Sequence, residues 1–240
     1  MTAKPSLAGP GQWLHPLARP AGAAESPLPP WLVRLMEQFA ARPDVFARFD
    51  PPDEGGRESA VLLLFGPDPQ GRDSILLLER ARDMRSHPGH VAFPGGSVDP
   101  GDDGAVGTAM REAAEEVNLD PEGVRILGTL PPVYFQVSSF LVTPVIAWWE
   151  HPTPVSPGHP GEVAQVILAP LEFLADPASR HTVHHPSGFL GPAWNIDDDV
   201  LLWGFTGGII STVLDLAGLA QPWDVGRTMP LPERLISGRR

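Results

Sequence analysis

The sequence predicts an α/β fold in which helices cover both faces of a mixed β-sheet, an α/β/α sandwich. Two observations carry this prediction. Short apolar runs of strand length alternate with longer stretches whose apolar residues recur at helical spacing, and Gly- and Pro-containing turns separate several of them. The 240 residues suit one domain with additional segments at its ends, and can bury a substantial core.

The chain begins with a region that does not predict regular structure. Residues 1–29 are rich in Pro, Ala and Gly without a period, so we expect a flexible tail. Pro30 then opens a helix over residues 31–41, because proline is favoured in the first turn. This helix and a linker make up residues 30–57.

Residues 58–220 are expected to form the main domain. Its predicted strands are residues 60–65, 74–79, 124–130, 141–149, 162–168, 180–184 and 200–203. Its predicted helices are the acidic helix around residues 110–117, a short helix at 171–174 and a longer one at 206–219. The Pro-rich C-terminal extension, residues 221–240, either packs over the domain or trails from it.

The helix around residues 110–117 places three carboxylates close together. Glu112, Glu115 and Glu116 are i, i+3 and i+4 neighbours on one helical face, while Met110, Ala113, Ala114 and Val117 form an apolar stripe. Like charges at this spacing repel, and a divalent cation such as Mg²⁺ would relieve the repulsion while leaving positions for phosphate oxygens. Taken alone, such a charge run is more often a solvated acidic face.

A glycine turn precedes this helix. Gly95 and Gly96 follow the apolar segment around Phe93 and precede an acidic loop at residues 99–103. Glycine lets the backbone approach a ligand and offers carbonyl or N–H groups to a metal or phosphate. Asn118, directly after the helix, is suited to a left-handed cap.

With its turn, the helix resembles the Nudix box, Gly-x5-Glu-x7-Arg-Glu-apolar-x-Glu-Glu-x-Gly-apolar. Gly96 opens the pattern, and its second half is matched by Arg111, Glu112, Ala113, Glu115, Glu116 and Leu119. There are three departures: the spacer is one residue longer, Asp102 or Asp103 replaces the first Glu, and Asn118 replaces the last Gly. The resemblance implies the Nudix fold and hydrolysis of a P–O–P bond with Mg²⁺, or alternatively Mn²⁺.

A second resemblance lies in residues 76–99, LLLERARDMRSHPGHVAFPGGSVD. This stretch looks like the signature of the coenzyme A pyrophosphatase branch, LLTxRSxxxRxxxGxVxFPGGxxD, from which Leu78 and Ala81 depart. The matching residues are Leu76, Leu77, Arg80, Arg85, Gly89, Val91, Phe93, Pro94, Gly95, Gly96 and Asp99. That branch also shares the longer spacer and Asp102. The resemblance implies cleavage of coenzyme A or acyl-CoA into adenosine 3′,5′-bisphosphate and (acyl-)4′-phosphopantetheine.

The family resemblance implies roles for individual residues. Glu112, Glu115 and Glu116 would be metal ligands, completed by a backbone carbonyl of Gly95 or Gly96. Arg111 would orient Glu115, its i+4 partner. The base that deprotonates the attacking water would be Glu115 or Glu162, although Glu162 also suits a surface acid at the start of a strand.

Basic residues cluster just before the glycine turn. Arg80, Arg82 and Arg85, near His87 and His90, are expected to bind the anionic substrate together with Gly95 and Gly96. They would supply local positive charge in a chain whose formal net charge is −12. The alternative for each of these basic residues is a salt bridge at a strand end.

Composition excludes several classes of function. The net charge of −12 argues against nucleic-acid and anionic-membrane partners, which need a basic face. The lack of cysteine excludes disulfides, thiolate zinc sites and cysteine nucleophiles, and fits a reducing compartment. Residues 201–220 have the length of a membrane span but contain Asp215 and Gly207-Gly208, which favours a strand followed by a buried helix. We therefore expect a soluble, cytoplasmic protein.

Two residue clusters have a simpler explanation than function. His181, His184 and His185 lack a nearby carboxylate or cysteine to complete a metal site, and are interpreted as part of a surface strand. Trp148, Trp149 and Trp203 are expected in a core or interface, with stacking on adenine as the alternative.

Alternative functions stay open at this stage. The same fold could hydrolyse ADP-ribose, NADH or a nucleoside triphosphate. A non-catalytic ligand sensor or interaction module is a third hypothesis, and its usual mark would be loss of the box glutamates, all of which are present. A homodimer is expected only by analogy with relatives.

Overall fold

The computed structural model describes residues 26–42, 45, 56–135 and 139–236. The tail expected over residues 1–29 lies outside the described residues except for 26–29, as does most of the linker before residue 56. Among the helices of the described part, none is long and apolar enough to cross a membrane.

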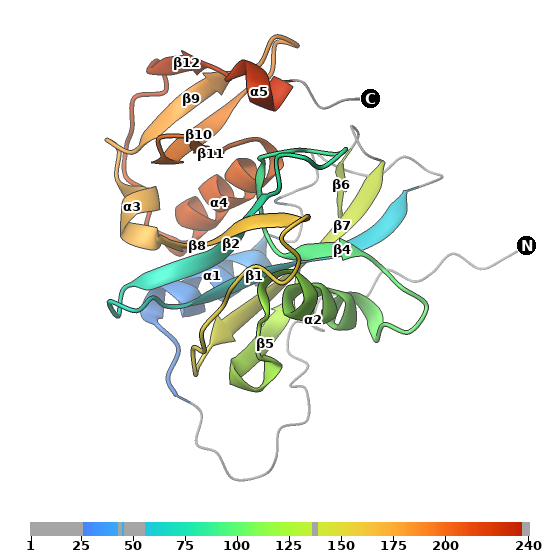
Figure 1. Cartoon of the computed structure of the whole chain (residues 1–240). Coiled ribbons are helices and arrows are strands. Elements are labelled where there is room, and N and C mark those ends of the chain that lie inside the picture. Colours follow the sequence, from blue (N-terminus) through green and yellow to red (C-terminus); the bar gives the residue numbers. More distant parts are fainter. Residues whose placement is uncertain (1–25, 43–44, 46–55, 136–138, 237–240) are drawn as a thin grey trace, which may run out of the picture.

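The larger of two sheets has strands in the order β3-β2-β1-β7-β5, with β4 beside β1, β6 beside β7 and β8 beside β2 (Figure 1). The strand β1 pairs with β7 in parallel and with β2 and β4 in antiparallel fashion, so the sheet is mixed as predicted. Its strands are β1 (Arg57–Pro67), β2 (Asp73–Arg80), β3 (Val91–Ala92), β4 (Gly95–Ser97), β5 (Val124–Thr129), β6 (Val133–Phe135), β7 (Phe140–Trp149) and β8 (Val163–Pro170).

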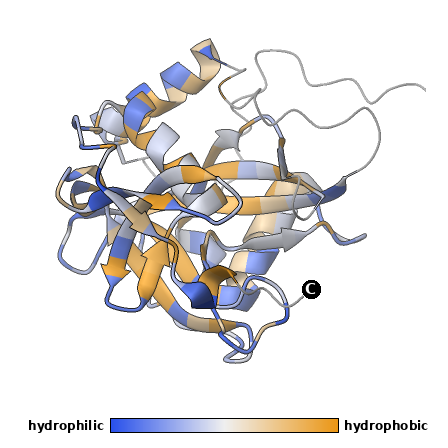
Figure 2. Cartoon of the chain, turned by 90° about the horizontal axis from the view of Figure 1, so that it is seen from above, coloured by the Kyte–Doolittle hydropathy of each residue, from blue (hydrophilic) through white to orange (hydrophobic). Residues whose placement is uncertain are grey.

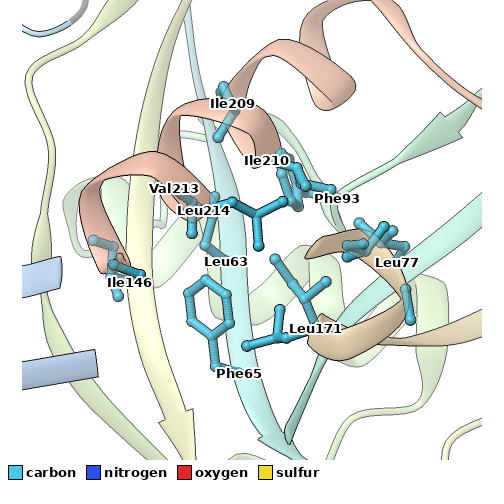
Figure 3. Close-up of a cluster of buried hydrophobic side chains, with 14 of the residues drawn as sticks. Leu63, Phe65, Leu77, Phe93, Ile146, Leu171, Ile209, Ile210, Val213 and Leu214 are labelled. Atoms are coloured by element: carbon cyan, nitrogen blue, oxygen red, sulfur yellow. The ribbon is translucent and has the colours of Figure 1, made fainter. Parts of the chain in front are cut away.

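Helices cover both faces of this sheet, because its central strands are buried on both sides. On one face, Leu62, Leu64 and Leu76 pack against the helix α2 (Gly104–Val117). On the other face, a cluster that includes Leu63, Phe65, Leu77 and Ile210 packs against α4 (Gly204–Ala217), as Figure 3 shows. The helix α1 (Pro30–Ala41) lies beside α4. The predicted α/β/α sandwich is therefore confirmed.

A second sheet, which the sequence did not predict, packs against the far side of α4 (Figure 1). Its order is β11-β10-β9-β12. Trp194 and Leu202 of this sheet share a core with the helix. The elements are α3 (Leu171–Ala175), which precedes the sheet, β9 (Arg180–His184), β10 (Leu190–Asp197), β11 (Val200–Leu202), β12 (Thr228–Pro230) and α5 (Glu233–Ile236). A short 3₁₀ helix, Pro121–Gly123, follows α2.

The small sheet corrects one prediction and resolves an open one. His181 is only 1% exposed, so the interpretation of residues 181–185 as a surface strand is wrong for this residue. The reason is that β9 is an inner strand of the sheet, between β10 and β12. The C-terminal extension packs on the domain, since β12 pairs with β9. Figure 2 shows hydrophobic residues concentrated in the strands and hydrophilic ones in many connecting loops.

Candidate active site

The helix α2 ends as its sequence predicts. Asn118 has φ 53° and ψ 38°, the left-handed conformation expected of a C-cap. Its side-chain amide donates to Ser156 Oγ at 3.1 Å, and Gly158 N–H donates to Glu116 O at 2.9 Å. A Cβ at Gly158 would lie 1.8 Å from Glu115 O. The loop after β7 is therefore packed directly against the C-terminal turn of the acidic helix.

The three glutamates of α2 occupy different environments. Glu116 is 8% exposed and lies at the buried side of the helix, while the side chain of Glu112 is 18% exposed and that of Glu115 is 55% exposed. The predicted apolar stripe is wrong at Ala114, which is exposed. The helix is rotated so that Ala109, Ala113, Glu116 and Val117 face inward.

Gly95 and Gly96, predicted to form a turn, instead begin β4, because they pair with Val61 and Ala60 of β1. The name glycine turn is kept for this pair, and Glu116 joins the helix α2 to it. Gly95 N–H donates to Glu116 Oε2 at 2.9 Å. Burial raises the pKa of Glu116 to about 7, although the hydrogen bond from Gly95 and the charge of Arg80 act in the opposite direction. Gly95 has φ 156°, and a Cβ there would lie 2.2 Å from Ala60 O, so only glycine lets the turn approach β1 this closely.

Glu112 lies against the second glycine of the turn. A Cβ at Gly96 would lie 2.3 Å from Glu112 Oε1, so the carboxylate occupies the space that any other residue would fill. Burial raises the pKa of Glu112, and the hydrogen bond from Arg111 partly offsets this effect. Glu112 and Glu116 thus approach the Gly95-Gly96 turn from the same helix, whereas Glu115 stays at the surface.

This arrangement fits a hard divalent cation. Within the described ranges, no group of three His, Cys, Asp or Glu side chains is already arranged to hold a metal ion. The donor types are nevertheless suitable, since two carboxylates and main-chain oxygens next to a Cβ-free turn are the oxygen ligands that Mg²⁺ prefers. Among the predicted ligands, Glu112, Glu116 and Gly96 lie together. Glu115 lies farther out and is linked to Glu112 by the Arg111 side chain, which contacts both.

The main partner of Arg111 is Asp102, which sequence reasoning did not identify. Arg111 Nε donates to Asp102 Oδ1 at 2.8 Å and Nη2 donates to Oδ2 at 3.0 Å. Arg111 Nη1 also contacts Glu112 at 3.0 Å and the expected partner Glu115 at 3.3 Å. The Arg111 hydrogen bonds hold the pKa of Asp102 well below its usual range. The sequence could have indicated this residue, because Asp102 stands where the Nudix box has its first Glu.

The three predicted substrate-binding arginines differ in their surroundings. Arg80 alternates with Leu76 and Leu78 on the α2 face of β2, and its buried Nε has no hydrogen-bond partner among the described residues. Arg82 contacts Glu79 at 3.4 Å and lies 4.0 Å from Asp199, so the salt-bridge alternative holds for this residue. Arg85 is exposed.

Glu162 is near the site but lies at the surface. It precedes β8, and its carbonyl accepts a hydrogen bond from Ala81 N–H at 2.8 Å. Its charge is among those that raise the pKa of Glu116, so its carboxylate is within electrostatic reach of the buried one. Both alternatives for this residue, base and surface acid, are compatible with that position.

A buried carboxylate that contacts Arg82 was also missed by the sequence analysis. Glu79 is 2% exposed and accepts a hydrogen bond from Gln165 Nε2 at 2.7 Å. The signal was a charged residue directly after a continuous apolar run, in a strand that is buried on both faces. Glu79 lies on the face of β2 opposite Arg80, where its carboxylate contacts Arg82.

Comparisons with known proteins agree with this geometry. The NUDIX domain family model matches residues 56–186. A protein named uncharacterized Nudix hydrolase NudL from Enterobacter sp. (strain 638) is 40% identical over 161 residues, covering 64% of this chain and 79% of that protein. Its namesake from Escherichia coli (strain K12) is 36% identical over 156 residues, with the same coverage.

The aligned region is shorter in another relative. NudL from Pectobacterium atrosepticum is 43% identical over 118 residues, which cover 48% of this chain and 58% of that protein. Among solved structures, a Nudix hydrolase from M. smegmatis, RenU, is 28% identical with a TM-score of 0.42, covering 51% of this chain and 76% of its own. Since the family model matches more than half of the residues, the chain belongs to the Nudix family and is a Nudix hydrolase.

Proposed function

We propose that the chain hydrolyses the pyrophosphate bond of coenzyme A or acyl-CoA, giving adenosine 3′,5′-bisphosphate and (acyl-)4′-phosphopantetheine. One observation carries the choice of substrate. Arg80, which belongs to the stretch resembling the coenzyme A pyrophosphatase signature, carries a buried donor that has no partner in the described part of the chain, and it acts electrostatically on Glu116. A guanidinium in this position suits an anionic phosphate oxygen.

Nudix hydrolases generally use divalent metal ions such as Mg²⁺. In this chain we assign Glu112, Glu116, a carbonyl of Gly95 or Gly96, and the more exposed Glu115 as the residues that would hold Mg²⁺ or Mn²⁺. When bound, the ion neutralises charge on the phosphate oxygens and makes a water more acidic.

The chain's own residues would perform the remaining steps. Arg111 orients Glu112 and Glu115, and Arg80 binds a phosphate oxygen. A water oxygen forms a bond to one phosphorus while the bridging oxygen leaves with the other phosphate group. Glu115 or Glu162 accepts the proton that this water loses. Arg85 and the Gly96 amide would provide further contacts for the substrate, and Arg82 would add one on leaving Glu79. The Gly95 amide, in contrast, is already bonded to Glu116.

A panel of substrates tests the proposal. Purified protein with Mg²⁺ or Mn²⁺ is expected to hydrolyse coenzyme A with a kcat/KM at least about tenfold above ADP-ribose, NADH and nucleoside triphosphates, about 1.4 kcal/mol of discrimination. Equal or better turnover of any of these competitors would contradict the choice of coenzyme A.

Matched glutamine variants test the metal assignment. Glu116→Gln should lower kcat/KM by two orders of magnitude or more, roughly the effect of losing a main electrostatic contribution. Glu122→Gln, an exposed glutamate just after α2, should behave like the parent protein. Metal binding without hydrolysis of any substrate would instead favour the ligand-sensor hypothesis.

The broader assignments stay predictions. These are the division into a domain at residues 58–220 with segments at both ends, the cytoplasmic location and a homodimer.

A further inference from the structure

The loop of residues 81–90 connects β2 to β3 and carries two of the arginines proposed to bind substrate. Its base is closed by main-chain hydrogen bonds from Arg80 N–H to His90 O at 2.9 Å and from Gly89 N–H to Arg80 O at 3.1 Å. Within the loop, His87 has φ 51°, a left-handed conformation that is costly for a residue other than glycine. Contacts from outside the loop must therefore help to hold it.

The C-terminal strap, residues 228–236, lies at the edge of the small sheet (Figure 1). Its first part forms β12, which pairs with β9, and Leu231 N–H donates to His184 O at 3.0 Å. Leu231 and Leu235 are each 4% exposed and pack in a cluster with Val183, Ala193, Leu201 and the half-buried Trp203. The position of Leu235 is thus fixed by burial of its side chain.

The strap reaches the loop of residues 81–90 through Leu235. His90 Nε2 lies 3.3 Å from Leu235 O, and because a carbonyl can only accept, Nε2 is the ring nitrogen that carries the proton. The Leu235 side chain also reaches the loop, since a Cβ at Gly89 would lie 3.9 Å from its Cδ2. These contacts join residues that are 145 positions apart in sequence.

Aromatic rings surround His90 on its other sides. Its ring centroid lies 5.2 Å from that of His87 and 5.2 Å from that of Trp203. Trp203 is stacked in turn on His185, with centroids 6.1 Å apart and an angle of 13° between the rings. Protein rings thus flank Trp203 on two sides, which favours a supporting role for this indole over the alternative of stacking on adenine.

We infer that His90, hydrogen-bonded to the main chain of Leu235, is a positioning residue that fixes the loop of residues 81–90 and so the placement of its arginines. The loop starts directly after Arg80, whose main chain is bonded to both Gly89 and His90. Movement of His90 would therefore also move the guanidinium proposed to bind phosphate. The expected effect on substrate affinity rests on the proposed function, whereas the expected effect on loop order does not.

The first test measures loop order without any substrate. His90→Phe keeps an aromatic ring between His87 and Trp203 but cannot donate to Leu235 O. Amide hydrogen exchange in residues 82–90 should become about five- to tenfold faster, as expected for the loss of one hydrogen bond. His151→Phe, at an exposed histidine, should leave exchange in the loop unchanged.

The second test approaches the pair from the strap. Leu235→Ala should accelerate exchange in the same loop, whereas Ile236→Ala, at an adjacent and more exposed residue, should not. With the best substrate of the panel, His90→Phe and Leu235→Ala should raise KM about fivefold or more and leave kcat within about twofold, because positioning affects binding more than the chemical step.

The outcomes separate the inference from the proposed function. Unchanged loop exchange in both His90→Phe and Leu235→Ala would overturn the inference, whatever the substrate is. Faster exchange with an unchanged KM would also overturn it, since the loop would then be ordered by the strap without serving the substrate. Failure of the parent protein to prefer coenzyme A would contradict the proposed function alone, and the exchange result would still decide the role of His90.

Discussion

Arg111 and Asp102 form a two-point ion pair, with Arg111 Nε 2.8 Å from Asp102 Oδ1 and Nη2 3.0 Å from Oδ2. Thr108 Oγ1 donates to the same carboxylate at 2.8 Å. The remaining nitrogen of the guanidinium is then directed to Glu112 and Glu115. The acidic loop before α2 thus sets the orientation of the arginine that in turn orients two glutamates.

Asp102→Asn should therefore impair activity through Arg111. The amide can accept only through one oxygen, so the two-point geometry is lost and Glu112 and Glu115 are held less well. We expect kcat to fall roughly ten- to a hundredfold, the usual effect of a displaced catalytic group. Steady-state kinetics would show this, and Asp103→Asn, at the exposed neighbour, is the control. Equal kcat values for the two variants would contradict this role.

Gly96→Ala should weaken metal binding more than folding. Its Cβ would lie 2.3 Å from Glu112 Oε1, which is the end of a flexible side chain that can move away. The fold should tolerate this movement, but the Glu112 carboxylate would leave the turn. Titration with Mn²⁺ should show at least about tenfold weaker binding, the order expected when metal-site geometry is disturbed. Gly101→Ala, where a Cβ meets no described atom within 4 Å, should bind Mn²⁺ normally.

Gly158→Ala should destabilise the fold. A Cβ at this position would lie 1.8 Å from the main-chain oxygen of Glu115, which is fixed in the helix and cannot move aside cheaply. We expect a loss of about 1–3 kcal/mol in the free energy of unfolding, the usual range for overpacking. Chemical denaturation measures this loss, with Gly161→Ala as the matched variant because a Cβ there meets none of the described residues within 4 Å. A comparable loss in both variants would refute the assigned cause.

Acidification should reduce stability in part through His90. Burial lowers the pKa of His90 to about 4 from an ordinary value of 6.5, with His87, Arg80 and Arg234 as cationic neighbours and the Leu235 carbonyl acting in the opposite direction. Between these two values the unfolded chain binds more protons than the folded one. The free energy of unfolding therefore falls as the pH falls through this window.

Denaturation at several pH values checks this contribution. The stability of the parent protein relative to His90→Gln should decrease by about 2 kcal/mol between pH 6.5 and pH 4, because the variant lacks the titrating ring. His151→Gln, at an exposed position, should follow the parent protein across the same range. A difference between parent and His90→Gln that does not change with pH would exclude the assigned role of His90 burial.

Local patterns predicted much of the framework. Short apolar runs predicted β1, β2 and β7, and helical spacing predicted α1, α2 and α4. The element β10 was missed because Gly191 and Pro192 interrupt its apolar pattern, and β12 because three residues carry no periodic signal. Their pairing with β9 depends on partners distant in sequence.

By itself, the sequence determined which residue types meet at the candidate site and how they are spaced. The spacing of Glu112, Glu115 and Glu116 and the left-handed Asn118 depend on neighbouring residues, so helical geometry is enough to predict them. Only the tertiary structure decided that Glu116 is buried, that Arg111 is bound to Asp102, and that His90 meets Leu235. The physical reason is that burial and contacts between distant residues depend on how helices, sheets and loops pack. The spacing of neighbouring residues does not contain this information.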